Sequence, residues 1–193
     1  MASLVGQPAP AFKGDAAFKG EFKSISLADY KGKWLIFFFY PLDFTFVCPT
    51  EVTSLSDQLE EFHQRGAEVL GCSVDSKFSH QAWLNQPRNQ GGIQGTQYPI
   101  LSDINKTIAS DYGVLLEPAG IALRGLFLID PDGVVQAEMV NNLPIGRSTA
   151  EVLRLLDAAQ EAKKGVVCPM NYQKGKESIN PKQAKDWFAK NAK

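Results

Sequence analysis

The most reactive side chain of the sequence stands in the stretch Asp43–Val52, which reads DFTFVCPTEV. Cys48 follows an apolar run, and helical periodicity starts after Pro49, so the thiol is predicted to lie at a helix N-terminus. Unpaired backbone N–H groups and the helix dipole favour an anion there, and the thiolate is the nucleophilic form of cysteine. Thr45 adds a hydroxyl that can hydrogen-bond a thiolate or an oxygen substrate. Cys48 is therefore a candidate nucleophile, and the alternative is a structural thiol packed as a small hydrophobe.

The other two cysteines stand in different surroundings. Cys72 lies within AEVLGCSVD, an apolar strand pattern, and is predicted to be an inert core residue. Cys168 lies in the loop-like segment VVCPMNY, where an exposed free thiol without a use would be a hazard. His63 and His80 show no zinc-ligand spacing, so we predict surface or packing roles for them and no metal site.

Composition indicates an ordinary soluble protein. The chain has 193 residues, of which 44% are hydrophobic and 21% charged. The first residues lack the basic and apolar regions of a signal peptide, and the apolar run Trp34–Tyr40 is too short to span a bilayer. We therefore expect a cytoplasmic protein without membrane contact, in a compartment where a cysteine pair is redox-active more often than structural. The lysines that follow residue 162 are scattered, which favours a solvated arm over a nucleic-acid site.

The elements that must position Cys48 follow an α/β order. Residues 6–18 form an extended lead-in, 21–33 a short strand and a turn, and DPDG at 130–133 makes a hairpin of its two flanking strands. The other predicted strands are 34–40, 67–75 and 98–103, with hairpin strands at 123–129 and 134–140, and helices are predicted at 50–65, 76–86, 105–113, 148–165 and 182–191. This order predicts an α/β protein with a mixed central sheet flanked by helices, as in an elaborated thioredoxin-like fold. The composition changes after Gly165, so we divide the chain into a thioredoxin-like domain, 1–165, and a C-terminal arm, 166–193.

Pro41, Thr45 and Cys48 form the pattern P-x-x-x-T-x-x-C, which resembles the active-site signature of the peroxiredoxins. The surrounding text, FFFYPLDFTFVCPTEV, is similar to that of the typical two-cysteine peroxiredoxins, the alkyl hydroperoxide reductase C and thioredoxin peroxidase family. Further blocks that look like family segments follow in the right order: SVDSKFSHQAWLN, LRGLFLIDPDG, NNLPIGRSTAEVLRLL and VVCPMNY. Together these blocks cover much of the chain, which is far more specific than one short motif.

The resemblance implies a set of roles for the matching residues. Cys48 is the peroxidatic cysteine, which attacks the peroxide O–O bond and becomes a sulfenic acid. Thr45 helps to bind the peroxide oxygens, Pro41 shields and shapes the pocket, and Arg124 holds the thiolate and the transition-state charge. Two further residues match a supporting acid and a second arginine that orient Arg124, although an exposed ion pair would look the same in sequence: Glu51 and Arg147.

The resemblance also implies how the catalytic cycle is completed and which subunits, substrates and reductants take part in it. Cys168 matches the resolving cysteine, which in this class comes from the partner subunit of a homodimer, and the dimers can form a ring of five. The expected substrates are hydrogen peroxide and small organic hydroperoxides, with no metal or bound cofactor. The expected reductant is a thioredoxin-like protein, and a flavoprotein disulfide reductase or a tryparedoxin-like protein is the alternative.

The sequence departs from peroxide-sensitive members of the family in one feature. Those members share a G-G-L-G loop and a Tyr-Phe pair on the C-terminal helix, which together pack over the active site. Here the matching glycines are Gly91, Gly92 and Gly95 in a longer GGIQG loop, and the aromatic pair is Trp187 and Phe188. Because indole lacks the phenol hydroxyl, this over-oxidation clamp is predicted to be weaker and the sensitivity to over-oxidation to be intermediate.

Three other functions compete with a peroxidase. A thioredoxin-type disulfide reductase would need C-x-x-C, and the residue three positions after Cys48 is Glu51. A non-enzymatic holdase or scaffold would need exposed apolar surface, which a sequence does not reveal. Nucleic-acid binding by the basic tail would show a steep salt dependence.

Overall fold

The computed structural model describes residues 3–191 and divides the chain into two compact units. The first unit comprises residues up to 149 and the second the residues from 150 onwards. Helix α5 (Thr149–Ala162) is therefore grouped with the C-terminal segment, whereas the change of composition in the sequence falls after residue 165.

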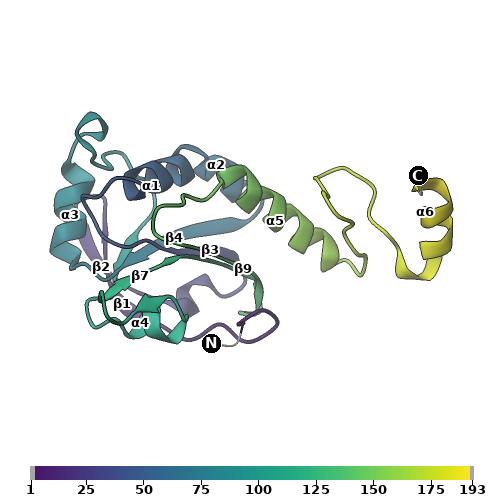
Figure 1. Cartoon of the computed structure of the whole chain (residues 1–193), viewed down its shortest axis with the longest axis horizontal. Coiled ribbons are helices and arrows are strands. Elements are labelled where there is room, and N and C mark those ends of the chain that lie inside the picture. Colours follow the sequence, from purple (N-terminus) through teal and green to yellow (C-terminus); the bar gives the residue numbers. More distant parts are fainter. Residues whose placement is uncertain (1–2, 192–193) are drawn as a thin grey trace. The chain divides into compact units, whose positions relative to one another are not determined.

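A mixed sheet forms the centre of the first unit (Figure 1), as the sequence predicted. Among the described residues it has seven strands in the order β2-β1-β5-β4-β3-β8-β9. Strands β3, β4 and β5 run parallel to one another, and β8 pairs antiparallel with both β3 and β9. The strands are β1 (Lys13–Phe18), β2 (Glu21–Ser26), β3 (Trp34–Phe39), β4 (Ala67–Ser73), β5 (Ile100–Ser102), β8 (Arg124–Ile129) and β9 (Val135–Asn141).

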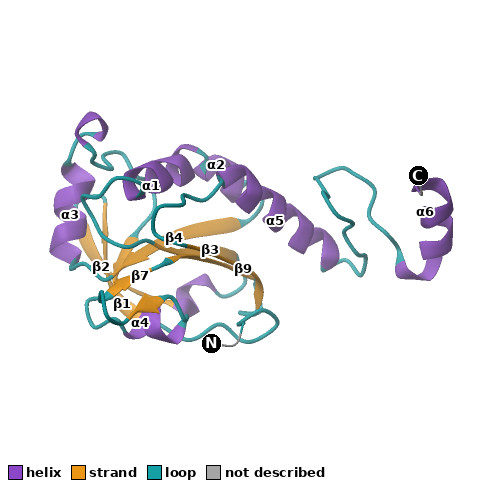
Figure 2. Ribbon diagram, viewed as in Figure 1, coloured by secondary structure: helices purple, strands orange, loops and turns teal. Residues whose placement is uncertain are grey.

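Helices cover both sides of this sheet. Figure 2 shows α1 and α2 on one side and α4 on the other. The described α-helices of the first unit are α1 (Cys48–Asp57), α2 (Leu59–His63), α3 (Lys77–Asn85) and α4 (Thr107–Asp111), and its 3₁₀ helices are η1 (Leu27–Tyr30) and η2 (Arg88–Gln90). A small hairpin pairs β6 (Leu115–Leu116) with β7 (Ile121–Ala122). Within residues 3–191, no helix has both the length and the apolar character that crossing a membrane requires.

Strand β3 is buried over its whole length because both faces of the sheet are covered. Its side chains alternate between two cores, as the period of a strand requires. Phe37 packs on one face, with its ring centroid 5.0 Å from that of Tyr112, which follows α4. Phe38 points to the other face, where its centroid lies 5.9 Å from that of Tyr98. This rigid strand leads directly into the loop that precedes Cys48.

Several predicted elements need correction. The extended lead-in contains a strand, β1, because residues 13–18 pair with β2 across the two-residue turn Lys19–Gly20. The single helix expected at 50–65 is two helices, because Gln58 leaves the helical conformation with φ −106° and ψ 15°. The hairpin of β6 and β7 was not predicted, since two-residue strands carry no periodicity.

The second unit consists of α5, a loop, η3 (Pro181–Gln183) and α6 (Ala184–Asn191). The loop folds on itself through a β-bridge between Val167 and Ile179, with backbone hydrogen bonds of 2.9 and 2.8 Å. Arg154 of α5 donates to the carbonyl oxygen of Tyr172 at 3.5 Å. Cys168 lies in this loop, and the helix predicted at 182–191 is present as η3 and α6.

Candidate active site

Cys48 is the first residue of helix α1, which begins two residues earlier than the periodicity after Pro49 predicted. Val47 is the N-cap, and its carbonyl oxygen accepts the backbone N–H groups of Thr50 and Glu51 at 3.0 and 3.3 Å. Pro49 has no N–H to satisfy, which makes it well suited to a first turn. The Cys48 side chain is fully buried.

Arg124 supplies a positive charge beside the sulfur. It begins strand β8, which is the neighbour of β3, and it is buried to 3% exposure. Its Nη1 donates to Cys48 Sγ at 3.4 Å, and its Nε donates to the carbonyl oxygen of Leu143 at 2.6 Å. A guanidinium in this place would stabilise negative charge that develops on a leaving oxygen.

Glu51 and Arg147 fix the place of Arg124. Glu51 lies in the first turn of α1, and its Oε2 accepts Nη1 of Arg124 at 2.7 Å. Arg147 approaches from the segment before α5, donating Nε to Oε1 at 2.7 Å, Nη2 to Oε2 at 3.0 Å and its backbone N–H to Oε1 at 2.9 Å. Its guanidinium also lies 5.2 Å from the ring centroid of Phe38. The alternative of an exposed ion pair is therefore wrong, since all three side chains are at most 4% exposed.

The charges of this cluster balance only when Cys48 is ionised. Two guanidinium groups face one carboxylate, which leaves a net positive charge in a buried place. A thiolate at Cys48 neutralises that charge within hydrogen-bond distance of Arg124. Uncompensated buried charge is costly, and this one lies beside the sulfur of Cys48.

A pocket of about 410 Å³ lies over this end of the sheet. Pro41, Thr45 and Arg124 contribute to its wall, together with the apolar side chains of Leu143 and Pro144. The hydroxyl of Thr45 donates to the carbonyl oxygen of Leu42 at 2.9 Å, so its lone pairs remain able to accept a hydrogen bond from a ligand. The pocket thus offers an acceptor, a cation and an apolar wall to a small oxygen compound.

The other two cysteines have different surroundings. Cys72 is fully buried in β4, as predicted, and burial raises the pKa of its thiol well above the ordinary value. Cys168 belongs to the second unit, where its Sγ donates to the carbonyl oxygen of Ala158 at 3.4 Å. Its partial burial also raises the pKa of the Cys168 thiol. The role of Cys168 as the resolving thiol stays a prediction.

The residues of the predicted over-oxidation clamp divide between the two units. Gly91 and Gly95 have φ of 78° and 86°, which favours glycine, and a Cβ on Gly92 would lie 2.0 Å from the carbonyl oxygen of Gln86. Trp187 and Phe188 are on α6, with ring centroids 5.4 Å apart. The indole N–H of Trp187 is buried and has no hydrogen-bond partner among residues 3–191.

Sequence reasoning missed a buried polar network next to the pocket. His80, predicted to be a surface or packing residue, is fully buried, and its Nδ1 lies 2.9 Å from Oδ2 of Asp43. The hydroxyl of Tyr40 donates to Oδ1 of Asp43 at 2.8 Å. No spacing rule links Asp43 to His80, 37 positions apart, so no signal in one sequence could have found this pair. Residues 3–191 contain no group of three or more histidine, cysteine, aspartate and glutamate side chains that could hold a metal ion.

Comparison with known proteins identifies relatives of this chain. Residues 5–138 match the family described as AhpC/TSA. The chain is 54% identical over 182 residues to the thioredoxin peroxidase of Echinococcus granulosus, covering 94% of each chain. It is 51% identical over 191 residues to peroxiredoxin tpx1 of Schizosaccharomyces pombe, covering 98% of this chain and all of that protein. It is also 54% identical to the human mitochondrial thioredoxin-dependent peroxide reductase, of which it covers 75%.

The fold is similarly close to solved structures. The reduced 2-Cys peroxiredoxin of Plasmodium vivax has a TM-score of 0.93 and 46% identity, covering 97% of this chain and all of that one. AhpC of Enterococcus faecalis has a TM-score of 0.81 and 38% identity, covering 87% of this chain and all of that one. The prediction of a thioredoxin-like α/β fold is thereby confirmed.

Replacing Arg124 with glutamine tests the electrostatics of the cluster. We expect Arg124→Gln to slow alkylation of Cys48 by iodoacetamide at neutral pH by about tenfold, because an adjacent cation changes the balance of thiol and thiolate by at least that factor. The rate is measured in a Cys72→Ser, Cys168→Ser background, where Cys48 is the one thiol of the chain. Arg65→Gln, which removes an arginine paired with Glu61 on α2, is the control and should alkylate normally. An unchanged rate in Arg124→Gln would show that its charge does not act on the sulfur.

Proposed function

Since the chain belongs to the AhpC/TSA family and is a thiol-dependent peroxidase of the two-cysteine peroxiredoxin type, we propose that Cys48 is its peroxidatic cysteine and Cys168 its resolving cysteine. The observation that carries the assignment of Cys48 is the Arg124 guanidinium 3.4 Å from its sulfur, in a buried cluster that an ionised thiol makes neutral. The thiol of Cys72 has no such partner charge and lies within the core.

The first step is a displacement at oxygen. The Cys48 thiolate attacks one peroxide oxygen, a sulfur–oxygen bond forms, and the O–O bond breaks. Sulfur is oxidised to sulfenic acid, and the other oxygen leaves as hydroxide or alkoxide, which takes up a proton to give water or an alcohol. Arg124 stabilises the charge that passes from sulfur to the leaving oxygen, and Glu51 and Arg147 hold Arg124 in place.

The pocket wall orients the peroxide for this step. Thr45 can accept the peroxide O–H, because its own hydrogen is already donated to Leu42. Pro41 is buried at the head of the loop and limits the entry of water. The apolar side chains of Leu143 and Pro144 leave room for the alkyl group of a small organic hydroperoxide as well as for hydrogen peroxide.

The second step forms a disulfide. The thiol of Cys168 condenses with the sulfenic acid of Cys48, a sulfur–sulfur bond forms, and water leaves. We propose that this thiol comes from the partner subunit of a homodimer, that dimers can assemble into a ring of five, and that a thioredoxin-like reductant restores both thiols. A flavoprotein disulfide reductase is the alternative reductant, to be separated by coupling the assay to each in turn. The scheme needs no metal or bound cofactor, since sulfur itself carries the oxidation.

A cytoplasmic location is also proposed. Free thiols that cycle through a disulfide suit a reducing compartment. The similarity to a protein named as mitochondrial makes the mitochondrion the alternative, and cell fractionation separates the two.

Three serine variants test the assignment of the cysteines. We expect Cys48→Ser to abolish peroxide consumption, because a serine hydroxyl is not appreciably ionised at neutral pH. Wild type treated with peroxide should run as a disulfide-linked dimer on a non-reducing gel, and both Cys48→Ser and Cys168→Ser should lack that band. Cys72→Ser is the matched control and should keep it. An oxidised monomer with an intrachain Cys48–Cys168 bond in peptide mass mapping would overturn the intersubunit disulfide.

Shortening the C-terminus tests the over-oxidation clamp. Deleting residues 187–193 removes the aromatic pair Trp187 and Phe188, so local opening should become easier. Disulfide formation with Cys168 should then be faster than oxidation of the Cys48 sulfenic acid to sulfinic acid. We expect less sulfinic acid on Cys48 than in the full chain, by about threefold or more, measured by mass spectrometry during turnover at high peroxide. Deleting only 189–193 keeps both rings and should match the full chain. Equal sulfinic acid in the longer deletion and the full chain would mean that the aromatic pair is not the clamp.

A further inference from the structure

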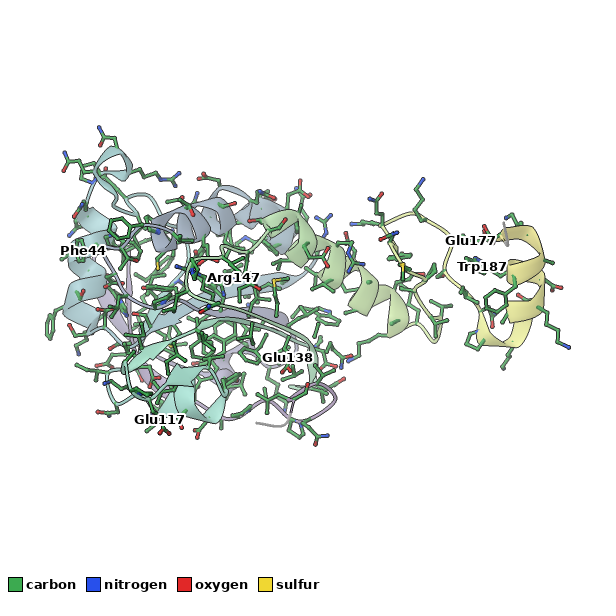
Figure 3. All side chains as sticks on the ribbon, viewed as in Figure 1. Phe44, Glu117, Glu138, Arg147, Glu177 and Trp187 are labelled. Carbon is green, nitrogen blue, oxygen red and sulfur yellow. The ribbon has the colours of Figure 1, made fainter. Side chains whose placement is uncertain are left out.

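The loop that carries Pro41 and Thr45 contains a strained residue. Phe44 lies between them and has φ of 55°, a conformation that bulky side chains rarely adopt. Its ring is half exposed and lies beside α3 (Figure 3), with its centroid 6.0 Å from that of Trp83. Such a backbone conformation is energetically unfavourable and persists only where the surroundings hold it. The contacts on either side of Phe44 must therefore fix the loop.

Asp43, the residue before Phe44, is held from several directions. Its carboxylate accepts the hydroxyls of Tyr40 and Ser79, each at 2.8 Å. His80 Nδ1 lies 3.1 and 2.9 Å from its two oxygens. Its backbone N–H donates to Oδ2 of Asp75 at 3.0 Å. The side chains of Asp43 and His80 are 1% and 0% exposed, so water does not compete for these bonds.

The two ring nitrogens of His80 lie within hydrogen-bond distance of two different parts of the protein, the loop at Asp43 and strand β5. Its Nε2 lies 3.2 Å from the carbonyl oxygen of Leu101, which can only accept, so Nε2 carries a hydrogen. Its Nδ1 lies 2.9 Å from Oδ2 of Asp43 and 3.4 Å from the hydroxyl of Tyr40. His80 therefore ties the loop through Asp43 to β5, an inner strand of the sheet.

From this arrangement, we infer that His80 is a positioning residue for the peroxidase reaction. It acts through Asp43, holding the strained loop so that Thr45 and Pro41 line the same pocket as Arg124, the partner of Cys48. Its ring nitrogens have Tyr40, Asp43 and Leu101 as hydrogen-bond partners, whereas the charged group beside the Cys48 sulfur is Arg124. The inference rests on the proposed function of Cys48 and concerns the orientation of peroxide rather than the activation of sulfur.

Two substitutions of His80 separate positioning from folding. His80→Leu keeps the bulk of the side chain but loses both hydrogen bonds, and leaves the Asp43 carboxylate without one of its donors. We expect it to lower the second-order rate constant for hydrogen peroxide by about 100-fold, as loss of orientation does, and to change alkylation of Cys48 by iodoacetamide less than about threefold. His80→Asn can still donate to Asp43 and should recover most of the peroxide rate. His63→Gln, on the exposed surface of α2, is the matched histidine control and should behave as wild type.

Tyr40→Phe and Ser79→Ala extend the test to variants that keep His80. Each removes one hydroxyl donor to Asp43 and little volume, so each is expected to fold and to lose about threefold to tenfold in the peroxide rate alone. If folded His80→Leu keeps the wild-type peroxide rate, or loses alkylation in the same proportion, the inference is wrong. If His80→Leu does not fold, unchanged peroxide rates in both hydroxyl variants overturn it. An inactive wild type would instead overturn the proposed function, so the two failures are distinguishable.

Discussion

The active site depends on one interaction, the binding of the buried Glu51 carboxylate by Arg124 and Arg147. A buried carboxylate is stable only when its charge is matched and its oxygens are hydrogen-bonded, and here both oxygens accept from guanidinium groups. The second guanidinium leaves one unit of positive charge unmatched. Arg124 places that positive charge beside the Cys48 sulfur, and a thiolate there brings the net charge of the cluster to zero. The reactive state of the thiol is thus also the state in which the buried cluster is neutral.

The sheet determines that these groups meet. Strand β3 ends where β8 begins, because the two are antiparallel and Phe38 pairs with Leu126. The loop and helix that follow β3 therefore place Cys48 and Glu51 over the first residue of β8, which is Arg124. Strand β3 is buried over its whole length, which gives the loop a fixed starting point, and Glu51 links α1, which carries Cys48, to Arg124. The strained loop at Phe44 then needs its own anchor, which the network of Asp43 and His80 supplies.

Much of this arrangement could be predicted from the sequence, for physical reasons that differ from residue to residue. The apolar run of β3, the helix stripe of Val52, Leu55 and Phe62 and the core position of Cys72 follow from periodicity, and all are buried. The helix terminus at Cys48 follows from Pro49. The partnership of Glu51 with Arg147, 96 residues apart, could be expected only from family resemblance, because spacing carries no information at that separation. The bond from Asp43 to His80 lay beyond both kinds of reasoning.

The central claim is that Arg124 stabilises the Cys48 thiolate and the departing oxygen, and that Glu51 holds Arg124 in the position where it can do so. A double-mutant cycle with Glu51→Gln and Arg124→Gln tests it through the second-order rate constant for hydrogen peroxide. Each single variant should lose about 100-fold or more, and the double variant should be within about threefold of Arg124→Gln, because both changes remove the same interaction. Losses that multiply in the double variant would contradict the account, since they would mean that the two residues act on the reaction independently.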